Sequence, residues 1–124
     1  MNNLVFQYYI PYEIGDKDLG GTDMPDWANA GKRSAQEYAK ICGAEYMLDD
    51  SRYFKHIDPR LDSTKIVFDP QFDKYDMILS MDLDMHIATR ANIFNLKVDD
   101  IAMVYEHVVL TPGPAGWMRN VMDV

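Results

Sequence analysis

Short apolar runs alternate with polar segments along the chain, and their lengths predict strands. Residues 4–10 (LVFQYYI) form a β-branched and aromatic run that ends at Pro11, which is typical of a first strand. The following segment, up to residue 24, is dense in glycine and aspartate and predicts a loop. Residues 44–50 (AEYMLDD) predict a second strand that ends in acidic residues. The first half of the chain therefore contains two predicted strands.

Between these strands the spacing of apolar and small residues becomes that of a helix. They recur four, four, three and four positions apart, a spacing that places them on one face of a helix. These residues are Trp27, Gly31, Ala35, Tyr38 and Cys42. Thr22 or Asp23 can cap the start, and Pro25 suits the first turn. Gly43 can adopt the left-handed conformation that ends a helix. We expect a helix over residues 25–42.

The second half of the chain completes an α/β order. Residues 51–65 are mixed and polar and predict no element. Residues 77–81 (MILSM) are continuously apolar except for Ser80, which favours a strand buried on both faces of a parallel sheet. A short helix over residues 88–95 and a strand over residues 101–110 are expected to follow. This order predicts a mostly parallel sheet flanked by helices.

Composition limits the possible functions. The 124 residues, 48% of them hydrophobic, suit a single domain, residues 1–124. The net charge of −8 disfavours nucleic-acid binding through a basic face, although a divalent cation would still allow a phosphorylated ligand to bind. Cys42 is the only cysteine, so an intrachain disulfide and a cysteine-based metal cluster are excluded. No run approaches the ~18 apolar residues of a membrane span, and we expect a cytoplasmic protein.

Asp82 and Asp84 directly follow the apolar run. If the strand stays extended, their side chains share one side about 6.5–7 Å apart and repel by roughly 2 kcal/mol; a bend would bring them closer. Either both are solvated residues of a turn, or a cation neutralises them. Magnesium-like ions bind such carboxylates and keep positions for substrate phosphates, and ligands of open α/β sheets bind beyond the carboxyl ends of strands.

Two phosphoryl-transfer patterns use acidic residues in this way, and the chain departs from both. A haloacid-dehalogenase-like phosphotransferase would use Asp82 as nucleophile and Asp84 as general acid, but it has Thr or Val where His86 stands, and its pair usually follows the first strand. A receiver domain also has its acidic pair after the first strand, whereas Asp49 and Asp50 end the second. An Asp-based phosphotransferase is therefore the less favoured alternative.

Residues 72–96, FDKYDMILSMDLDMHIATRANIFNL, resemble the Y-D-K, hydrophobic run and D-x-D block of GT-A fold glycosyltransferases, especially the glycogenin-like family eight. The order of elements upstream is also similar, so the resemblance covers roughly residues 4–106. Only residues 75–94 are specific. The resemblance implies a Rossmann-like GT-A nucleotide-binding domain and hexosyl transfer from a nucleoside-diphosphate sugar to an unknown acceptor.

The resemblance also implies a ligand set. Asp82 and Asp84 would hold Mn²⁺ (or Mg²⁺) on the donor diphosphate, and Asp82 could also face the nucleotide ribose. Lys65 stands near the position of a lysine that touches the donor in the family, and the alternative is a solvated lysine before a strand. His86 could coordinate the ion or simply line the site. The nucleotide base would be flanked by the end of the first strand, Tyr8, Tyr9 and Ile10.

The chain departs from the family in length. Family members are about twice as long, and their second half carries the acceptor site; here 40 residues follow Asp84. We therefore expect either the N-terminal part of a longer enzyme or a trimmed domain that binds a nucleotide sugar without efficient transfer. A further alternative is a non-catalytic α/β binding or assembly domain with a vestigial D-x-D, which would form homo-oligomers through its apolar surface.

Overall fold

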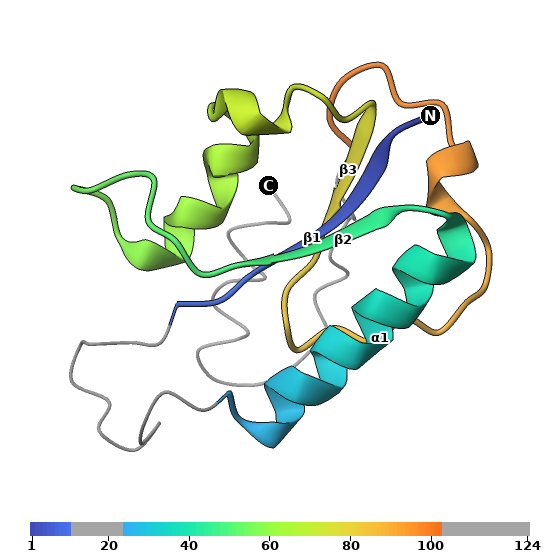
Figure 1. The fold of residues 1–124 in the computed structure, drawn as a ribbon, viewed down its shortest axis with the longest axis horizontal. Helices are drawn as coiled ribbons and strands as arrows, with labels where there is room; N and C mark the ends of the chain where they lie inside the picture. The colour runs from blue at the N-terminus through green and yellow to red at the C-terminus, as the bar shows by residue number, and fades with distance from the viewer. Residues whose placement is uncertain (11–23, 103–124) are drawn as a thin grey trace, which may run out of the picture.

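The computed structural model of the protein describes residues 1–10 and 24–102, which form an α/β fold (Figure 1). Three parallel strands pair in the order β2-β1-β3. The central strand, β1, runs between its two neighbours, and the α-helix α1 connects it to β2. The bounds of these elements are β1 Asn3–Tyr8, α1 Asp26–Cys42, β2 Glu45–Asp49 and β3 Met77–Ser80. This arrangement is compatible with a Rossmann-like class.

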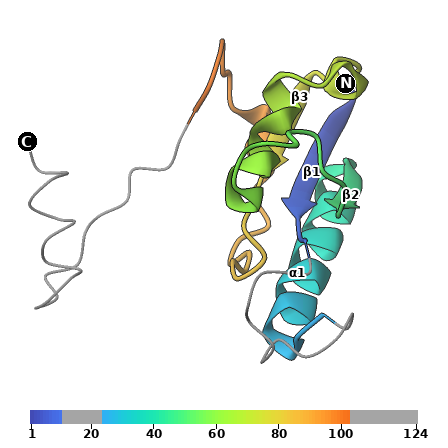
Figure 2. The same ribbon diagram turned by 90° about the vertical axis from the view of Figure 1, so that its left-hand side faces the viewer.

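The sheet is covered on both faces, as the turned view shows (Figure 2). Helix α1 packs on one face, together with the 3₁₀ helix η4 (Ile93–Asn95). The 3₁₀ helices η2 (Pro59–Val67) and η3 (Pro70–Phe72) pack on the other. Coverage on both faces explains why each strand contains three consecutive apolar residues, at 4–6, 46–48 and 77–79, rather than an alternation with polar ones.

The alternation of β1 divides the core into two clusters. Val5 packs with Ala35 and Tyr38 of α1. Leu4 and Phe6 point to the opposite face, where the Phe6 ring meets Phe72 edge-on with 5.4 Å between the ring centroids. Full burial of each such side chain contributes about 1.5–3 kcal/mol. The central strand therefore anchors both layers.

The ends of α1 follow local chemistry. Pro25 occupies the N-cap position with extended backbone, and no side chain caps the helix among the described residues; the caps expected at Thr22 and Asp23 lie outside those residues. Gly43 ends the helix with φ 65°, and its N–H donates to the carbonyl oxygen of Lys40 at 3.2 Å. The helix and its glycine stop are confirmed.

The buried face of α1 differs from the expectation at its first turn. Gly31, Ala35 and Tyr38 are buried as predicted, but Trp27 is 52% exposed. Ala28 takes its place on the buried face, because at 3.6 residues per turn it lies about 35° from the mean direction of the other buried residues of α1, whereas Trp27 lies about 65° from it. The expectation that Trp27 packs in the core is wrong.

The three strands are confirmed with shorter bounds. Strand β3 was expected to be buried on both faces, but it lies at the edge of the sheet, and its residues are half-buried up to the exposed Ser80. The helix expected over residues 88–95 is wrong. Only the single 3₁₀ turn η4 forms there, and it is capped by Asn92, whose side chain accepts the N–H of Phe94 at 2.9 Å. Most of the expected strand 101–110 lies outside the described residues, and residues 101–102 have no regular structure. No helix within residues 1–10 and 24–102 is long and apolar enough to cross a bilayer.

Candidate functional site

The strand order creates a switch point at the carboxyl end of the sheet. From β1 the chain passes through α1 to β2 on one side, and β3 lies on the other side of β1. In open α/β sheets, ligands bind outside the carboxyl ends of the strands at such a point. Tyr8 ends β1, and Asp82 and Asp84 follow β3. The predicted metal and base residues therefore belong to the two strands that flank the switch point.

The acidic pair lies in a turn, which we call the acidic turn (residues 82–85). Strand β3 ends at Ser80, and the carbonyl oxygen of Asp82 accepts the N–H of Met85 at 3.2 Å. The chain therefore bends after the strand, the second of the two expected geometries. Asp82 and Asp84 are exposed, whereas Leu83 between them is buried and anchors the turn in the protein.

Both carboxylates of the acidic turn are available to a ligand from the described part of the chain. Within residues 1–10 and 24–102, neither Asp82 nor Asp84 has a side-chain hydrogen bond or ion pair. The same residues contain no group of three or more metal-ligating side chains. Two carboxylates fit a Mg²⁺-like ion that completes its shell with water and substrate phosphates, and they do not fit an ion that requires an all-protein cage.

Helix α1 approaches the acidic turn closely at Gly31. A Cβ atom built on Gly31 would lie 1.6 Å from the carbonyl oxygen of Leu83 and 3.4 Å from that of Met85. Real Cβ atoms essentially never lie closer than 3.0 Å to another heavy atom, so the 1.6 Å distance is prohibitive. A backbone oxygen also cannot rotate away as a flexible side chain can. Glycine at position 31 is therefore required for the acidic turn to lie against the helix.

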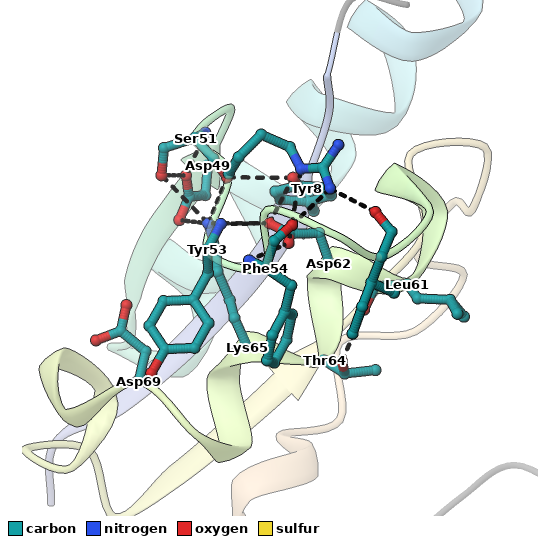
Figure 3. A network of polar contacts seen from close by, with 12 residues as sticks. Tyr8, Asp49, Ser51, Tyr53, Phe54, Leu61, Asp62, Thr64, Lys65 and Asp69 are labelled. Carbon is teal, nitrogen blue, oxygen red and sulfur yellow. Dashed lines mark hydrogen bonds and ion pairs between the residues drawn. The ribbon is translucent and has the colours of Figure 1, made fainter.

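A second polar cluster lies at the carboxyl ends of β1 and β2 (Figure 3). The ammonium nitrogen of Lys65, from η2, lies 2.6 Å from Asp49 Oδ2 at the end of β2 and 4.0 Å from Asp62 Oδ2. It also donates to the carbonyl oxygen of Ser51 at 2.7 Å and lies 4.9 Å from the centre of the Tyr8 ring. We call Tyr8, Asp49, Ser51, Asp62 and Lys65 the lysine network.

Asp62 is bonded through both of its carboxylate oxygens. It is fully buried and accepts the Tyr8 hydroxyl at 2.8 Å and the N–H groups of Tyr53 and Phe54 at 2.9 and 2.8 Å. The Nε atom of Arg52 lies 3.7 Å from Asp62 Oδ1. These bonds satisfy a carboxylate that burial would otherwise make very costly. Asp62 therefore fixes both the loop after β2 and the hydroxyl of Tyr8.

The lysine network shifts the pKa values of its members. Burial alone would raise the pKa of Asp49 and Asp62, but hydrogen bonds outweigh it and hold both below the ordinary value of 3.8. The decisive bonds come from Lys65 and Ser51 at Asp49, and from the backbone N–H groups and Tyr8 at Asp62. Burial, then the bond to Asp62, raises the pKa of the Tyr8 hydroxyl. Tyr8 is therefore a neutral hydrogen-bond donor at physiological pH.

The remaining site residues predicted from the sequence also lie near the carboxyl end of the sheet. Lys65 is 1% exposed, and its ammonium is paired with protein groups. Tyr9 and Ile10 are half-buried, and the N–H of Tyr9 donates to the carbonyl oxygen of Asp49 at 2.9 Å. His86 is exposed just beyond the acidic turn. The structure thus brings Tyr8 and Lys65 into direct contact and leaves the acidic turn as a separate cluster.

Asp49 and Asp62 were not among the site residues predicted from the sequence. Asp49 was noted only as the end of the second strand, and Asp62 lies in the segment for which no element was predicted. One signal was available, because Asp62 and Lys65 stand three residues apart and a 3₁₀ helix aligns such positions on one side.

No family model, curated protein or solved structure matches the chain. The resemblance to GT-A glycosyltransferases therefore depends on the D-x-D block and on the order of elements around it.

Proposed function

We propose that this chain is the donor-binding domain of a metal-dependent glycosyltransferase, which transfers a hexosyl group from a nucleoside-diphosphate sugar. One observation carries the proposal. Two exposed carboxylates, Asp82 and Asp84, follow β3 next to the switch point, and they have no partner among the described residues. Other exposed carboxylates, such as Asp73, also lack a partner, so it is the position of the pair beyond β3, at the end of the sheet where ligands of open α/β proteins bind, that favours a role in binding.

In this proposal Asp82 and Asp84 hold a Mn²⁺ or Mg²⁺ ion on the diphosphate of the donor. The bound ion would neutralise negative charge on the departing nucleoside diphosphate. The turn geometry supports this role, because the buried Leu83 fixes the backbone while both neighbouring carboxylates remain in solvent. A bound cation would also reduce any repulsion between the two carboxylates.

Tyr8 is the proposed platform for the nucleotide base. Its hydroxyl is held by Asp62, and the Lys65 ammonium lies over its ring. An aromatic ring that is held rigidly loses little entropy when a base stacks on it. We assign Lys65 to this positioning role and not to a direct diphosphate contact, because its ammonium is buried and already pairs with Asp49.

The test is the binding of nucleoside diphosphates with and without metal. Isothermal titration calorimetry would use UDP, GDP, UDP-glucose and GDP-mannose, each with Mn²⁺ and with excess EDTA. We expect one nucleotide series to bind only with Mn²⁺. A ligand at a hundredfold excess over its Kd should also stabilise the fold by about 2.7 kcal/mol in a thermal-shift assay.

Two variants make this test specific. Asp84→Ala should abolish metal-dependent binding and leave the fold intact, because its side chain is exposed. Asp73→Ala is the matched control. It removes an exposed carboxylate four residues before β3 begins, and thus near the amino end of the strand instead of its carboxyl end. Binding that persists in Asp84→Ala, or that does not require the metal, would refute the proposal.

A non-catalytic assembly domain is the second candidate, because one observation favours it. Helix η2 and the residue after it expose large apolar side chains on the face opposite α1, namely Leu61, Val67 and Phe68. In a 3₁₀ helix, positions such as 61, 64 and 67 align on one side. Sedimentation equilibrium of the native chain and of a Val67→Lys, Phe68→Lys variant would separate the candidates. An assembly domain would be oligomeric and would dissociate in the variant.

A further inference from the structure

A buried glutamine lies beneath the acidic turn. Gln7, in β1, is 0% exposed, and its Nε2 donates to the carbonyl oxygen of Asp82 at 3.4 Å. Its Oε1 accepts the hydroxyl of Tyr46, from β2, at 2.8 Å. The amide therefore links β2, β1 and the segment after β3 across the switch point, which no other side-chain hydrogen bond of the described residues does.

The identity of residue 7 is unexpected for its position. Leu4, Val5 and Phe6, which precede it in β1, are apolar and fully buried. An apolar residue would fill the same space at lower cost, because a buried amide is costly unless it is hydrogen-bonded. Both ends of the Gln7 amide are used, and one of them contacts the backbone of the acidic turn.

The bonded carbonyl is the one that closes the turn. The Asp82 oxygen accepts Gln7 Nε2 from below and the N–H of Met85 within the turn. The bond from Gln7 is long and therefore weak, and its direction depends on how the amide is held. Tyr46 holds it, because its hydroxyl donates to the opposite end of the same amide.

We infer that Gln7, oriented by Tyr46, is the positioning residue of the acidic turn and sets where Asp82 and Asp84 meet their metal. This inference rests on the proposed function for its metal, and its effect on the turn can be measured without one. Groups that orient metal ligands from behind typically change metal affinity 10–100-fold when they are removed.

The test compares two conservative variants with a matched control. Gln7→Met keeps the size of the side chain but removes the amide, and Tyr46→Phe removes only the hydroxyl that orients it. Tyr75→Phe is the control, since the Tyr75 hydroxyl donates to Glu45 at the start of β2, on the opposite face of the sheet. The two tyrosines are well matched: burial raises the pKa of each to about 12, with a contribution from Glu45 at Tyr75.

Two measurements are made on each variant, namely the hydrogen-exchange rate of the Met85 amide by NMR and the affinity for Mn²⁺ by calorimetry. We expect Met85 exchange to accelerate in Gln7→Met and, to a smaller extent, in Tyr46→Phe. Mn²⁺ affinity should fall at least tenfold in Gln7→Met, and the control should match the wild type in both measurements. If Gln7→Met does not fold, Tyr46→Phe alone decides the test.

The outcomes separate this inference from the proposed function. If Met85 exchange in the folded variants equals that of the wild type, the inference is overturned. It is also overturned if exchange accelerates but Mn²⁺ affinity is unchanged, or if Tyr75→Phe has the same effects. If the wild type binds no Mn²⁺ while Met85 exchange still responds to Gln7→Met, the positioning of the turn is supported and the proposed function fails.

Discussion

The ammonium nitrogen of Lys65 lies 2.6 Å from Asp49 Oδ2, and the lysine side chain is almost fully buried. A buried ion pair contributes little relative to apolar residues of the same shape, but removal of one partner leaves the other charge unpaired in the interior. Lys65 also faces Asp62, so its loss would leave Asp49 without a cation and Asp62 with Arg52 alone, at 3.7 Å. The lysine network is therefore the most vulnerable part of the fold.

Lys65→Met should destabilise the protein by about 3–5 kcal/mol. Methionine fills similar space, so the lost stability reports the charge and not a cavity. Urea denaturation followed by circular dichroism measures the change. Lys97→Met, at an exposed lysine, is the control and should change the free energy of unfolding by less than about 0.5 kcal/mol. Equal effects of the two substitutions would show that the Lys65 ammonium is not held as described.

Acid should destabilise the protein through Asp49 and Asp62. Both have a pKa lowered in the folded state. A lowered folded-state pKa contributes stability above the unfolded-state pKa, near 4, and this contribution is lost as pH falls through the folded-state pKa. The free energy of unfolding, measured by urea denaturation from pH 7 to pH 2, should therefore fall below about pH 4.

Asp49→Asn tests this origin of the acid sensitivity. Asparagine keeps the shape of Asp49 but does not titrate, so the variant should start with a lower free energy of unfolding at pH 7 and lose less of it on acidification. If the free energy of unfolding of the variant falls with pH in parallel with that of the wild type, the acid sensitivity comes from other carboxylates.

Gly31→Ala should destabilise the protein although alanine is the better helix former. Helix propensity alone favours alanine by about 1 kcal/mol. The new Cβ would lie 1.6 Å from the Leu83 carbonyl oxygen, so either the helix or the acidic turn must move. Overpacking of this kind costs about 1–3 kcal/mol. We expect a net loss of about 1 kcal/mol in urea denaturation and, under the proposed function, weaker Mn²⁺ binding. Arg33→Ala, on the exposed side of α1, should be neutral in both.

The sequence predicted the elements whose signals are local. The apolar runs of β1, β2 and β3 and the glycine stop at Gly43 depend on a few neighbouring residues, and the structure has them within two residues of the expected bounds. The helix expected at residues 88–95 failed because short segments of small and apolar residues do not distinguish a helix from a turn. Only Asn92, which caps η4, indicated a turn there.

The lysine network could not be predicted, because its contacts join residues distant in the sequence. Tyr8 bonds to Asp62, 54 positions away, and to the carbonyl oxygen of Ser51, 43 positions away. Charged residues are exposed in most proteins, so the spacing of Asp62 and Lys65 could indicate that they pair but not that both are buried. The acidic turn was found because Asp82 and Asp84 directly follow an apolar run, residues 77–81. Their geometry could not be found, since it depends on Gly31 and Gln7.

Tyr8 offers a test that separates its ring from its hydroxyl. Tyr8→Phe removes the bonds to Asp62 and to the Ser51 carbonyl oxygen, which should cost about 1–3 kcal/mol of stability because Asp62 stays buried with one donor fewer. Under the proposed function, the ring stacks on the nucleotide base and is kept in this variant. Nucleoside-diphosphate affinity in the presence of Mn²⁺ should therefore stay within a few-fold of the wild type.

Tyr8→Ala removes the ring as well, so it should lose the stacking contribution, about 1–3 kcal/mol of binding free energy. Calorimetry below the unfolding temperature of each variant keeps stability and binding apart, and urea denaturation gives the stability of each. If Phe and Ala weaken binding equally, the hydroxyl and not the ring contacts the ligand. If neither weakens it, the base binds elsewhere, and the carboxyl end of β1 serves only to hold the lysine network to the sheet.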